Sequence, residues 1–211
     1  MRRWSPILSL LLVCACADEP EPWVDVREPC ADRSELRNLY WGDMHVHTEY
    51  SFDAWMNDVR LSPDDAYRFA RGEPVRLPPL DAMGEGTQVV QIDRPLDFAA
   101  VTDHAEFLAE VEACRTPGSS AYESDTCQAF RIADDDALAQ WGLRLNPDQP
   151  RRFFDVCGEE GAQCDEGISA VWQRLQDAAE AAYDRSEACS FTSLVGYEYS
   201  GSSGLSNLHR N

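Results

Sequence analysis

Residues 42–48 read Gly-Asp-Met-His-Val-His-Thr and follow the apolar stretch 39–41. This pattern predicts a β-strand that enters a functional loop. Side chains two residues apart face the same side of a strand, so the imidazoles of His45 and His47 project together. Their Cα atoms would lie roughly 6.6 Å apart, a span that two imidazoles can close on one metal ion. Asp43 shares this face, where it would ligate the ion or orient a ligand. Taken alone, the pair could equally be two surface or core histidines.

A second polar pair ends the next strongly apolar segment. Residues 97–102 predict a buried strand that ends at Asp103 and His104. Because the carboxyl ends of parallel strands in α/β folds converge on one site, we expect His104 to lie near the first two histidines. Asp103 would fix the tautomer of His104 or ligate an ion itself. The alternative is that Asp103 caps a helix beginning at Ala105.

A third apolar segment carries a carboxylate. Residues 191–199 predict another strand that contains Glu198, and a Gly/Ser-rich loop then leads to His209. An unpaired carboxylate in an apolar strand is costly, and a bound cation would relieve that cost. An arginine partner for Glu198 is the alternative. His209 completes the set of four histidines in the chain.

The long segment 105–189 differs in character because it is acidic and predominantly helical in pattern. Its best helix is predicted over about 167–186, where one apolar face recurs at helical spacing. Ser62 and Pro63 predict an earlier helix that runs to about Arg71, and residues 87–92 predict a short strand. Taken as core, the apolar face of the long helix consists of Ile168, Val171, Trp172, Leu175, Ala178, Ala179 and Ala182.

Cysteine usage favours an oxidising compartment, since the chain has 8 Cys in 211 residues. Six of them follow the first 16 residues, and an even set suggests disulfides, although six cysteines permit 15 connectivities. Cys157 and Cys164 flank a short loop and are the first predicted pair, and Cys114 with Cys127 is the second. Zinc binding is the alternative, but no CxxC pair supports it.

The N-terminus resembles an export signal. Two arginines precede an apolar run that is too short to span a bilayer, and the run ends in Leu11-Leu12-Val13-Cys14-Ala15-Cys16. This arrangement resembles a bacterial lipoprotein signal over residues 1–15, with Cys16 as the lipidated N-terminus. The alternative is an ordinary secretory signal with unmodified Cys16. Residues 16–37 then predict an acidic tether, and ordered structure is expected from about Asn38. The expected location is extracytoplasmic, with attachment to a membrane through the lipid anchor on Cys16.

The charge balance bears on the partners. All 18 basic residues are Arg, and 38 acidic residues give a formal net charge of −20. Nucleic acids are held by surface cations that displace counterions, so this composition argues against a nucleic-acid binder. Because the chain is so acidic, binding an anionic substrate would require positive charge from a bound cofactor, and divalent metal ions are the obvious source.

Together these motifs resemble the opening motifs of the PHP (polymerase and histidinol phosphatase) superfamily. The wider phrases 42–48, 100–107 and 207–211 resemble a secreted bacterial branch catalogued only as a domain of unknown function, and the similarity covers residues 38–211. The resemblance implies an α/β fold with part of a distorted (β/α)7 barrel, interrupted by a disulfide-containing helical insertion at 105–189. The superfamily places a further His and an Asp-x-His motif downstream of these motifs, so we read the chain as the N-terminal part of a longer protein.

The resemblance also implies two or three divalent ions, usually zinc, manganese or iron. By motif position, His45 and His47 would bind the first ion, Glu198 would bridge the first and second, and His209 would bind the second. His104 would hold a third with Asp53, for which a solvated loop acid is the alternative. The six implied ligands are His45, His47, Asp53, His104, Glu198 and His209.

The expected activity is metal-dependent hydrolysis of a small anionic substrate, and the resemblance implies that this substrate is a phosphoester. Metal-activated water would attack phosphorus, and Arg210 would clamp a phosphate oxygen. The alternative for Arg210 is a plain surface ion pair. Two other functions stay open, namely a non-catalytic metal-binding lipoprotein and an inactive fragment.

Overall fold

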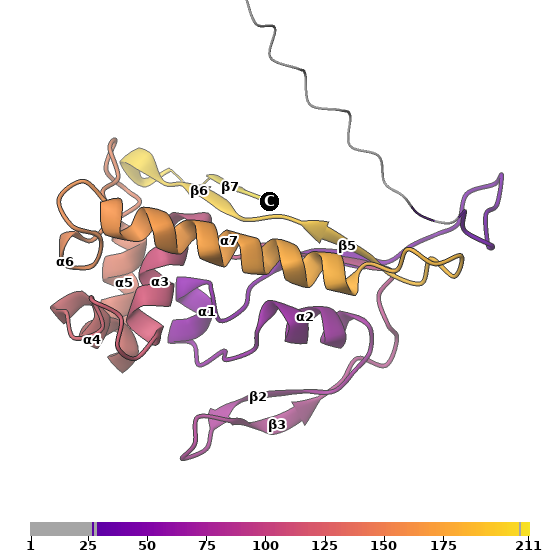
Figure 1. Cartoon of the computed structure of the whole chain (residues 1–211), viewed down its shortest axis with the longest axis horizontal. Helices are drawn as coiled ribbons and strands as arrows, with labels where there is room; N and C mark the ends of the chain where they lie inside the picture. The colour runs from indigo at the N-terminus through magenta and orange to yellow at the C-terminus, as the bar shows by residue number, and fades with distance from the viewer. Residues whose placement is uncertain (1–26, 28, 207) are drawn as a thin grey trace, which may run out of the picture.

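The computed structural model describes residues 27, 29–206 and 208–211, without the side chains of Glu166 and Leu205 (Figure 1). The predicted signal peptide, the lipidation of Cys16 and the first part of the acidic tether lie outside the described residues. Within them, no helix combines the length and the apolar character needed to cross a bilayer.

A three-stranded parallel sheet forms the centre of the fold. Its strands are β1 (Gly42–Val46), β4 (Phe98–Val101) and β5 (Thr192–Val195), in the order β1-β4-β5. Phe98 pairs with Gly42 on one side and with Thr192 on the other. A Cβ atom at residue 42 would collide with the Phe98 side chain, which explains the glycine at the start of β1.

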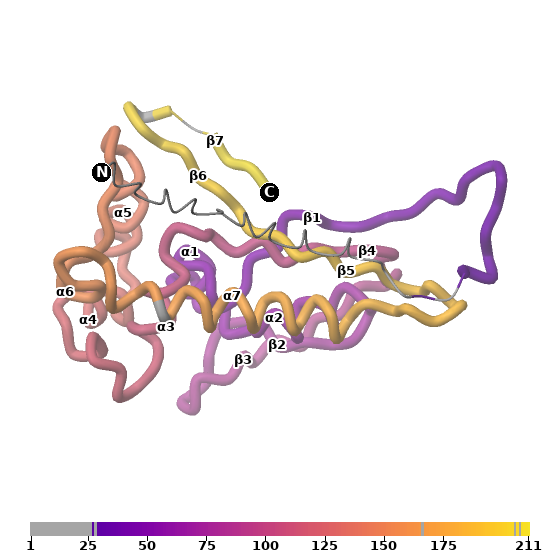
Figure 2. The backbone as a smooth tube through the Cα atoms, turned by 45° about the horizontal axis from the view of Figure 1, so that its top comes forward, coloured from indigo at the N-terminus to yellow at the C-terminus, as the bar shows by residue number. Residues whose placement is uncertain are grey.

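Two helices pack against each other and against β4 and β5. They are α2 (Pro63–Ala70) and α7 (Ala162–Ala182), and Figures 1 and 2 both show α7 running alongside β5. α2 begins where predicted, because Ser62 and Asp65 form a capping box. α7 begins and ends about five residues earlier than predicted. Its apolar face is confirmed as core, since Val171, Leu175, Ala178, Ala179 and Ala182 are buried.

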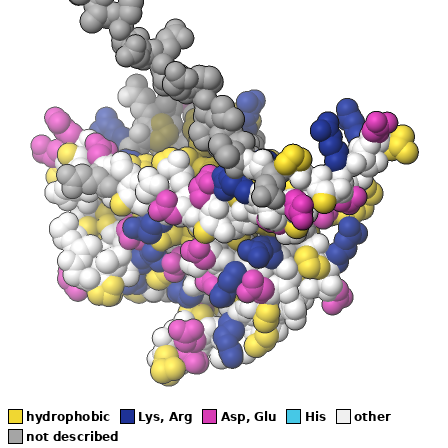
Figure 3. All heavy atoms as spheres, turned by 45° about the vertical axis from the view of Figure 1, so that its right-hand side comes forward, with side chains coloured by type: hydrophobic (Ala, Val, Ile, Leu, Met, Phe, Trp, Pro, Cys, Tyr) yellow, Lys and Arg dark blue, Asp and Glu magenta, His cyan; other side chains and the backbone are white. Residues whose placement is uncertain are grey.

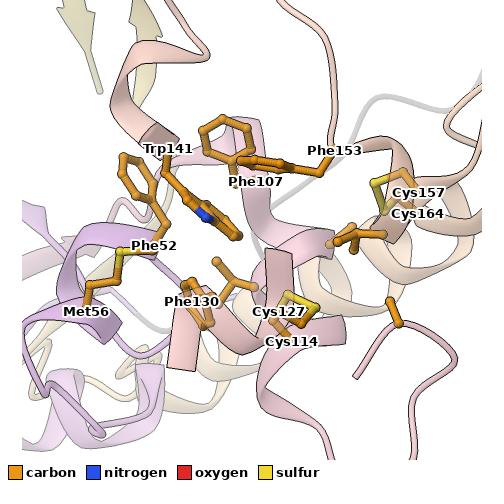
Figure 4. Close-up of a cluster of buried hydrophobic side chains, with 14 of the residues drawn as sticks. Phe52, Met56, Phe107, Cys114, Cys127, Phe130, Trp141, Phe153, Cys157 and Cys164 are labelled. Carbon is orange, nitrogen blue, oxygen red and sulfur yellow. A yellow bond between two sulfur atoms is a disulfide. The ribbon is translucent and has the colours of Figure 1, made fainter. Parts of the chain in front are cut away.

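Every element between β4 and β5 is helical. In order they are η1 (Ala105–Phe107), α3 (Leu108–Arg115), α4 (Asp125–Ile132), α5 (Asp135–Leu143), α6 (Phe154–Cys157) and α7. This helical insertion has its own aromatic core around Trp141, to which Phe52 of α1 (Phe52–Met56) also contributes (Figure 4). Cys114–Cys127 and Cys157–Cys164 form disulfides beside this core, which confirms both predicted pairs.

The third disulfide corrects the predicted tether. Cys30 is bonded to Cys189, and the Ala31 amide donates to the Glu187 carbonyl at 2.8 Å. The chain is therefore fastened to the segment before β5 at residue 30, eight residues earlier than the expected start at Asn38. The prediction missed this because the partner lies 159 positions away.

Two hairpins complete the described chain. One consists of β2 (Val75–Leu80) and β3 (Gly86–Val90), and it confirms the short strand predicted near 87–92. The other consists of β6 (Tyr199–Gly201) and β7 (Leu208–Arg210), with η2 (Ser203–Leu205) between them. The single strand predicted over 191–199 is thus divided, because β5 ends at Val195 and β6 turns away to pair with β7.

The fold is mixed α/β, as predicted, but the three parallel strands do not close into a barrel within the described residues. The PHP-type barrel therefore stays a prediction. On the face shown in Figure 3, acidic and arginine side chains are interspersed rather than gathered into one basic patch.

Candidate metal centre

The ends of the three parallel strands bring the predicted residues together. His45 lies in β1 with His47 just beyond it, His104 lies beyond β4, and Glu198 lies beyond β5. His104 and Glu198 pair directly through an isolated parallel bridge. The β6–β7 hairpin then returns His209 to the same place. We call His45, His47, Asp53, His104, Glu198 and His209 the strand-end cluster.

Glu198 lies at the middle of this cluster, and only 1% of its side chain is exposed. Its Oε2 accepts hydrogen bonds from Nε2 of His45 at 3.0 Å and from Nε2 of His47 at 2.7 Å. Its Oε1 contacts Nδ1 of His209. Glu198 is thus surrounded by imidazoles rather than paired with arginine.

Asp53 makes a second set of contacts on the far side of His47. Both of its oxygens lie 3.2 Å from His47 Nδ1, and its Oδ2 lies 3.7 Å from His104 Nε2. The hydroxyl of Ser51 donates to Asp53 Oδ1 at 2.6 Å. Asp53 is therefore more than a solvated loop acid, because it joins two of the four histidines.

The contacts within the cluster lower the pKa values of its carboxylates and raise those of His47 and His104. Burial raises the pKa of Glu198, but His209, His104 and His47 outweigh burial and hold that pKa below its usual value. Burial likewise raises the pKa of Asp53, and the nearby His104 ring together with hydrogen bonds from His47 and Ser51 lowers it strongly. Burial lowers the pKa values of His47 and His104, but Asp53 raises both, with help from Glu106 at His104. The carboxylates are therefore held anionic and attract cations.

Asp103 makes different contacts from those that its predicted roles require. It is fully buried, and its oxygens accept from the backbone N–H of Thr48 at 2.5 Å and from the Thr48 hydroxyl at 2.7 Å. Burial raises the Asp103 pKa to about 6, although the Thr48 hydrogen bonds lower it. Asp103 thus fastens the loop after His47 to the end of β4. It neither fixes the His104 ring nor caps the following helix, whose N-cap residue is His104.

Arg210 lies beside the cluster but on the other side of its strand. It pairs with Tyr199 in the hairpin, whereas His209 pairs with Ser200. Because successive side chains alternate across a strand, Arg210 faces away from His209. It lines a surface hollow with Trp172 and Tyr197, which does not match the predicted clamp on a substrate held at the histidines. Asp43 is also set apart, since it accepts from the His45 backbone N–H at 2.9 Å.

The structure adds three residues that the sequence interpretation missed. Ser51 lies between Asp53 and His47, and its Oγ accepts from the His104 backbone N–H at 3.2 Å. Glu106 and Ser200 lie against the His104 ring. Their nearness in sequence to predicted ligands could have indicated two of them, because Ser51 lies two residues from Asp53 and Glu106 lies two residues from His104.

The donor set fits divalent ions. Three groups each bring their ligand atoms within 4.8 Å of one another, namely His45–His47–Glu198, His47–Asp53–His104 and His104–Glu198–His209. Mixed imidazole and carboxylate donors suit zinc, iron and manganese. The side chains of His45 and His209 are 56% and 42% exposed, so the cluster is reached from solvent on that side.

Comparison with known proteins places most of the chain in one family. The family model described as "Protein of unknown function (DUF3604)" matches residues 34–211. Searches of curated proteins and of solved structures each gave no significant match.

Proposed function

The chain belongs to the DUF3604 family, and from its strand-end cluster we propose that it is a metal-dependent hydrolase whose ions share Glu198. One observation carries the proposal, which is that a carboxylate with only 1% of its side chain exposed contacts three imidazoles from two separate segments, the end of β1 and β7. A buried carboxylate that is held anionic needs compensating positive charge. Bound divalent ions would supply that charge more completely than hydrogen bonds from histidine.

Two ions account best for the shared residues. His45 and His47 with Glu198 would hold the first, and Glu198 with His104 and His209 would hold the second. The third group, His47–Asp53–His104, shares His47 and His104 with the other two. A neutral imidazole has only one unprotonated nitrogen, so neither histidine has a second nitrogen for a third ion. We therefore propose that Asp53 orients His47 by accepting a hydrogen bond from its protonated Nδ1, instead of holding a third ion.

The proposed reaction is hydrolysis of a small anionic ester, with phosphoesters as the leading class. When bound, the ions would lower the pKa of a coordinated water and neutralise charge on the substrate. The chain's own residues hold and orient these ions, and the exposed sides of His45 and His209 admit the substrate. Because the chain carries a net charge of −20, its own charge does not attract an anion.

The wider setting also belongs to the proposal. The His and Glu motifs favour a relation to the PHP superfamily and a barrel of its type. We further propose an extracytoplasmic, lipid-anchored protein with Cys16 as the attachment point. Three disulfides support this location, since such bonds persist in oxidising compartments.

The test is removal and return of the metal. Purified protein is treated with a chelator, assayed on phosphomonoesters and phosphodiesters, and then supplied with manganese or zinc. We expect hydrolysis to disappear and return, and we expect His45→Ala/His47→Ala to stay inactive throughout. Activity that is indifferent to chelator and metal would overturn the proposal. Bound metal without turnover would favour a non-catalytic metal-binding protein, and protein that binds no metal would favour an inactive fragment.

A further inference from the structure

Two residues outside the strand-end cluster, Glu106 and Ser200, lie against Nδ1 of His104. Ser200 Oγ lies 3.1 Å from His104 Nδ1, and Glu106 Oε2 lies 3.6 Å from the same nitrogen. The backbone N–H of Ser200 donates to the other Glu106 oxygen, Oε1, at 2.5 Å. Glu106 belongs to η1, which directly follows His104, and Ser200 belongs to β6.

One carboxylate oxygen of Glu106 is buried beside His104 without a hydrogen-bond donor among the described residues. Its Oε2 is sequestered from solvent and receives no hydrogen bond from any residue that the structure describes. At 3.6 Å the contact with His104 is longer than a hydrogen bond but well within the range of a charge interaction. A buried carboxylate oxygen favours a proton on the nearest donor nitrogen, and that nitrogen is Nδ1 of His104.

The opposite nitrogen of the ring points into the strand-end cluster. His104 Nε2 lies 3.7 Å from Asp53 Oδ2 and 3.8 Å from Glu198 Oε2. Both distances exceed those of hydrogen bonds. Ligands that each bind one zinc ion at about 2.0–2.2 Å are separated by comparable distances. The ring is thus turned so that Nε2, and not Nδ1, faces the other ligands.

We propose that Glu106 and Ser200 are positioning residues that keep a proton on Nδ1 of His104, so that Nε2 is the nitrogen that binds metal. The hydrogen bond made by one nitrogen of a histidine decides which nitrogen remains free for a metal. The inference rests on the proposed function. It assigns to Glu106 and Ser200 the control of the His104 tautomer that the sequence had suggested for Asp103.

Ser200 also contacts the second histidine of the same group. Its Oγ also lies 3.4 Å from His209 Nδ1, and Ser200 is the residue that pairs with His209 across the hairpin. The Ser200 side chain is buried, which suits a positioning role better than that of a nucleophile. Glu106 and Ser200 together therefore join η1 to the hairpin that carries His209.

Glu106→Gln separates positioning from a purely structural role. Glutamine keeps a carbonyl oxygen for the Ser200 N–H, so the link to β6 survives. Its amide group, however, presents N–H donors to His104 Nδ1 and so favours the tautomer with the proton on Nε2. We expect Glu106→Gln to bind one zinc ion per chain in place of two, with an unchanged melting temperature when both proteins are metal-free. Glu123→Gln, on an exposed position, is the matched control and is expected to retain both ions.

Two further measurements keep the inference testable if that variant folds poorly. Long-range proton–nitrogen NMR of the zinc-loaded wild type should show metal on Nε2 and a proton on Nδ1 of His104. Ser200→Ala should weaken the second zinc site by about 10-fold, the lower end of the loss seen when a ligand's hydrogen-bond partner is removed.

The outcomes separate this inference from the proposed function. Wild type that binds no metal would overturn both. Wild type with two ions, together with Glu106→Gln that binds two ions equally tightly, would overturn only the positioning role. Zinc found on Nδ1 of His104 would do the same.

Discussion

The protein buries two glutamates in two regions, and their surroundings are opposite. Glu198 lies in the strand-end cluster in contact with the imidazoles of His45, His47 and His209. Glu110 lies in the helical insertion and is 0% exposed, with Arg152 as its nearest cation at 3.7 Å. Neither oxygen of Glu110 receives a hydrogen bond from any residue in the described part of the chain.

This difference sets the charge of each carboxylate. Burial raises the pKa of both groups, but the imidazoles outweigh burial at Glu198 and lower its pKa. At Glu110 the distant guanidinium does not compensate, and the pKa rises to about 7. The sulfurs of Cys157 and Cys164 lie near Glu110 but are bonded to each other. The strand-end cluster thus offers an anionic ligand for a cation, whereas the helical insertion offers a largely neutral core residue.

The largest expected effect comes from removing the charge at Glu198. Glu198→Gln leaves the shape of the side chain but takes away the shared anionic ligand, so we expect zinc affinity to fall by more than about 100-fold, beyond the loss from an outer-shell partner. Metal content after gel filtration measures this. Glu110→Gln is the matched control, and it should bind as much zinc as the wild type. Equal zinc binding by Glu198→Gln would erase the distinction between the two glutamates.

The second prediction concerns the pH dependence of stability at Glu110. Its carboxyl has a pKa of about 7 in the folded state and a reference value of 4.5, so the folded protein holds the proton more tightly. The contribution of the Glu110 carboxyl to the free energy of unfolding is therefore fully present below pH 4.5 and is lost as the pH rises through 7. Between pH 4.5 and 8 the loss is roughly 3 kcal/mol.

Glu110→Gln should remove this loss. Denaturant unfolding in chelator, with disulfides intact, should show the variant gaining stability relative to the wild type by roughly 3 kcal/mol across that pH interval. If the wild type instead became more stable relative to the variant as the pH rises, Glu110 would have to be charged and paired in the folded protein, as Glu198 is.

The third prediction tests whether the two regions are energetically separate. Cys157→Ala/Cys164→Ala removes the bond beside Glu110, and a loop of this length contributes about 2.5 kcal/mol to the free energy of unfolding. We expect that loss in denaturant unfolding, with zinc affinity unchanged. A large drop in zinc affinity would show that the helical insertion supports the strand-end cluster directly.

The smallest expected effect lies at Ser51, which contacts Asp53, His47 and the His104 backbone. Ser51→Ala should weaken zinc binding by about 10-fold, because Asp53 loses a donor that orients it. Ser62→Ala is the control, since it removes the cap of α2 and costs about 1 kcal/mol of stability. It should leave zinc affinity unchanged, and calorimetric titration compares the two variants. Unchanged zinc affinity in Ser51→Ala would show that Ser51 does not support the zinc site.

Residue spacing predicted the strand-end cluster better than it predicted the contacts around it. Alternation along β1 placed His45 and His47 on one side, and the convergence of parallel strand ends placed His104 near them, whereas Asp53, Glu198 and His209 were added to the ligand set by the resemblance to the PHP superfamily. These rules depend only on local periodicity and topology. They also predicted α2 and the two local disulfides, whose partners are close in sequence.

The errors arose where a partner depends on tertiary packing. Asp103 binds Thr48, which lies 55 positions away and was not expected to fold back onto β4. Arg210 was assigned to the substrate because the β6–β7 hairpin was not predicted, and alternation along β7 turns it away. Cys30 has its partner 159 positions distant, and no local pattern indicates such a pair.

The most direct test of the account is anomalous X-ray scattering from crystals equilibrated with zinc. We predict two peaks within bonding distance of the Glu198 carboxylate, one beside His45 and His47 and the other beside His104 and His209, and none at Glu110. Crystals in which zinc avoids Glu198, or in which these imidazoles point apart, would contradict the claim that the strand ends assemble a metal centre.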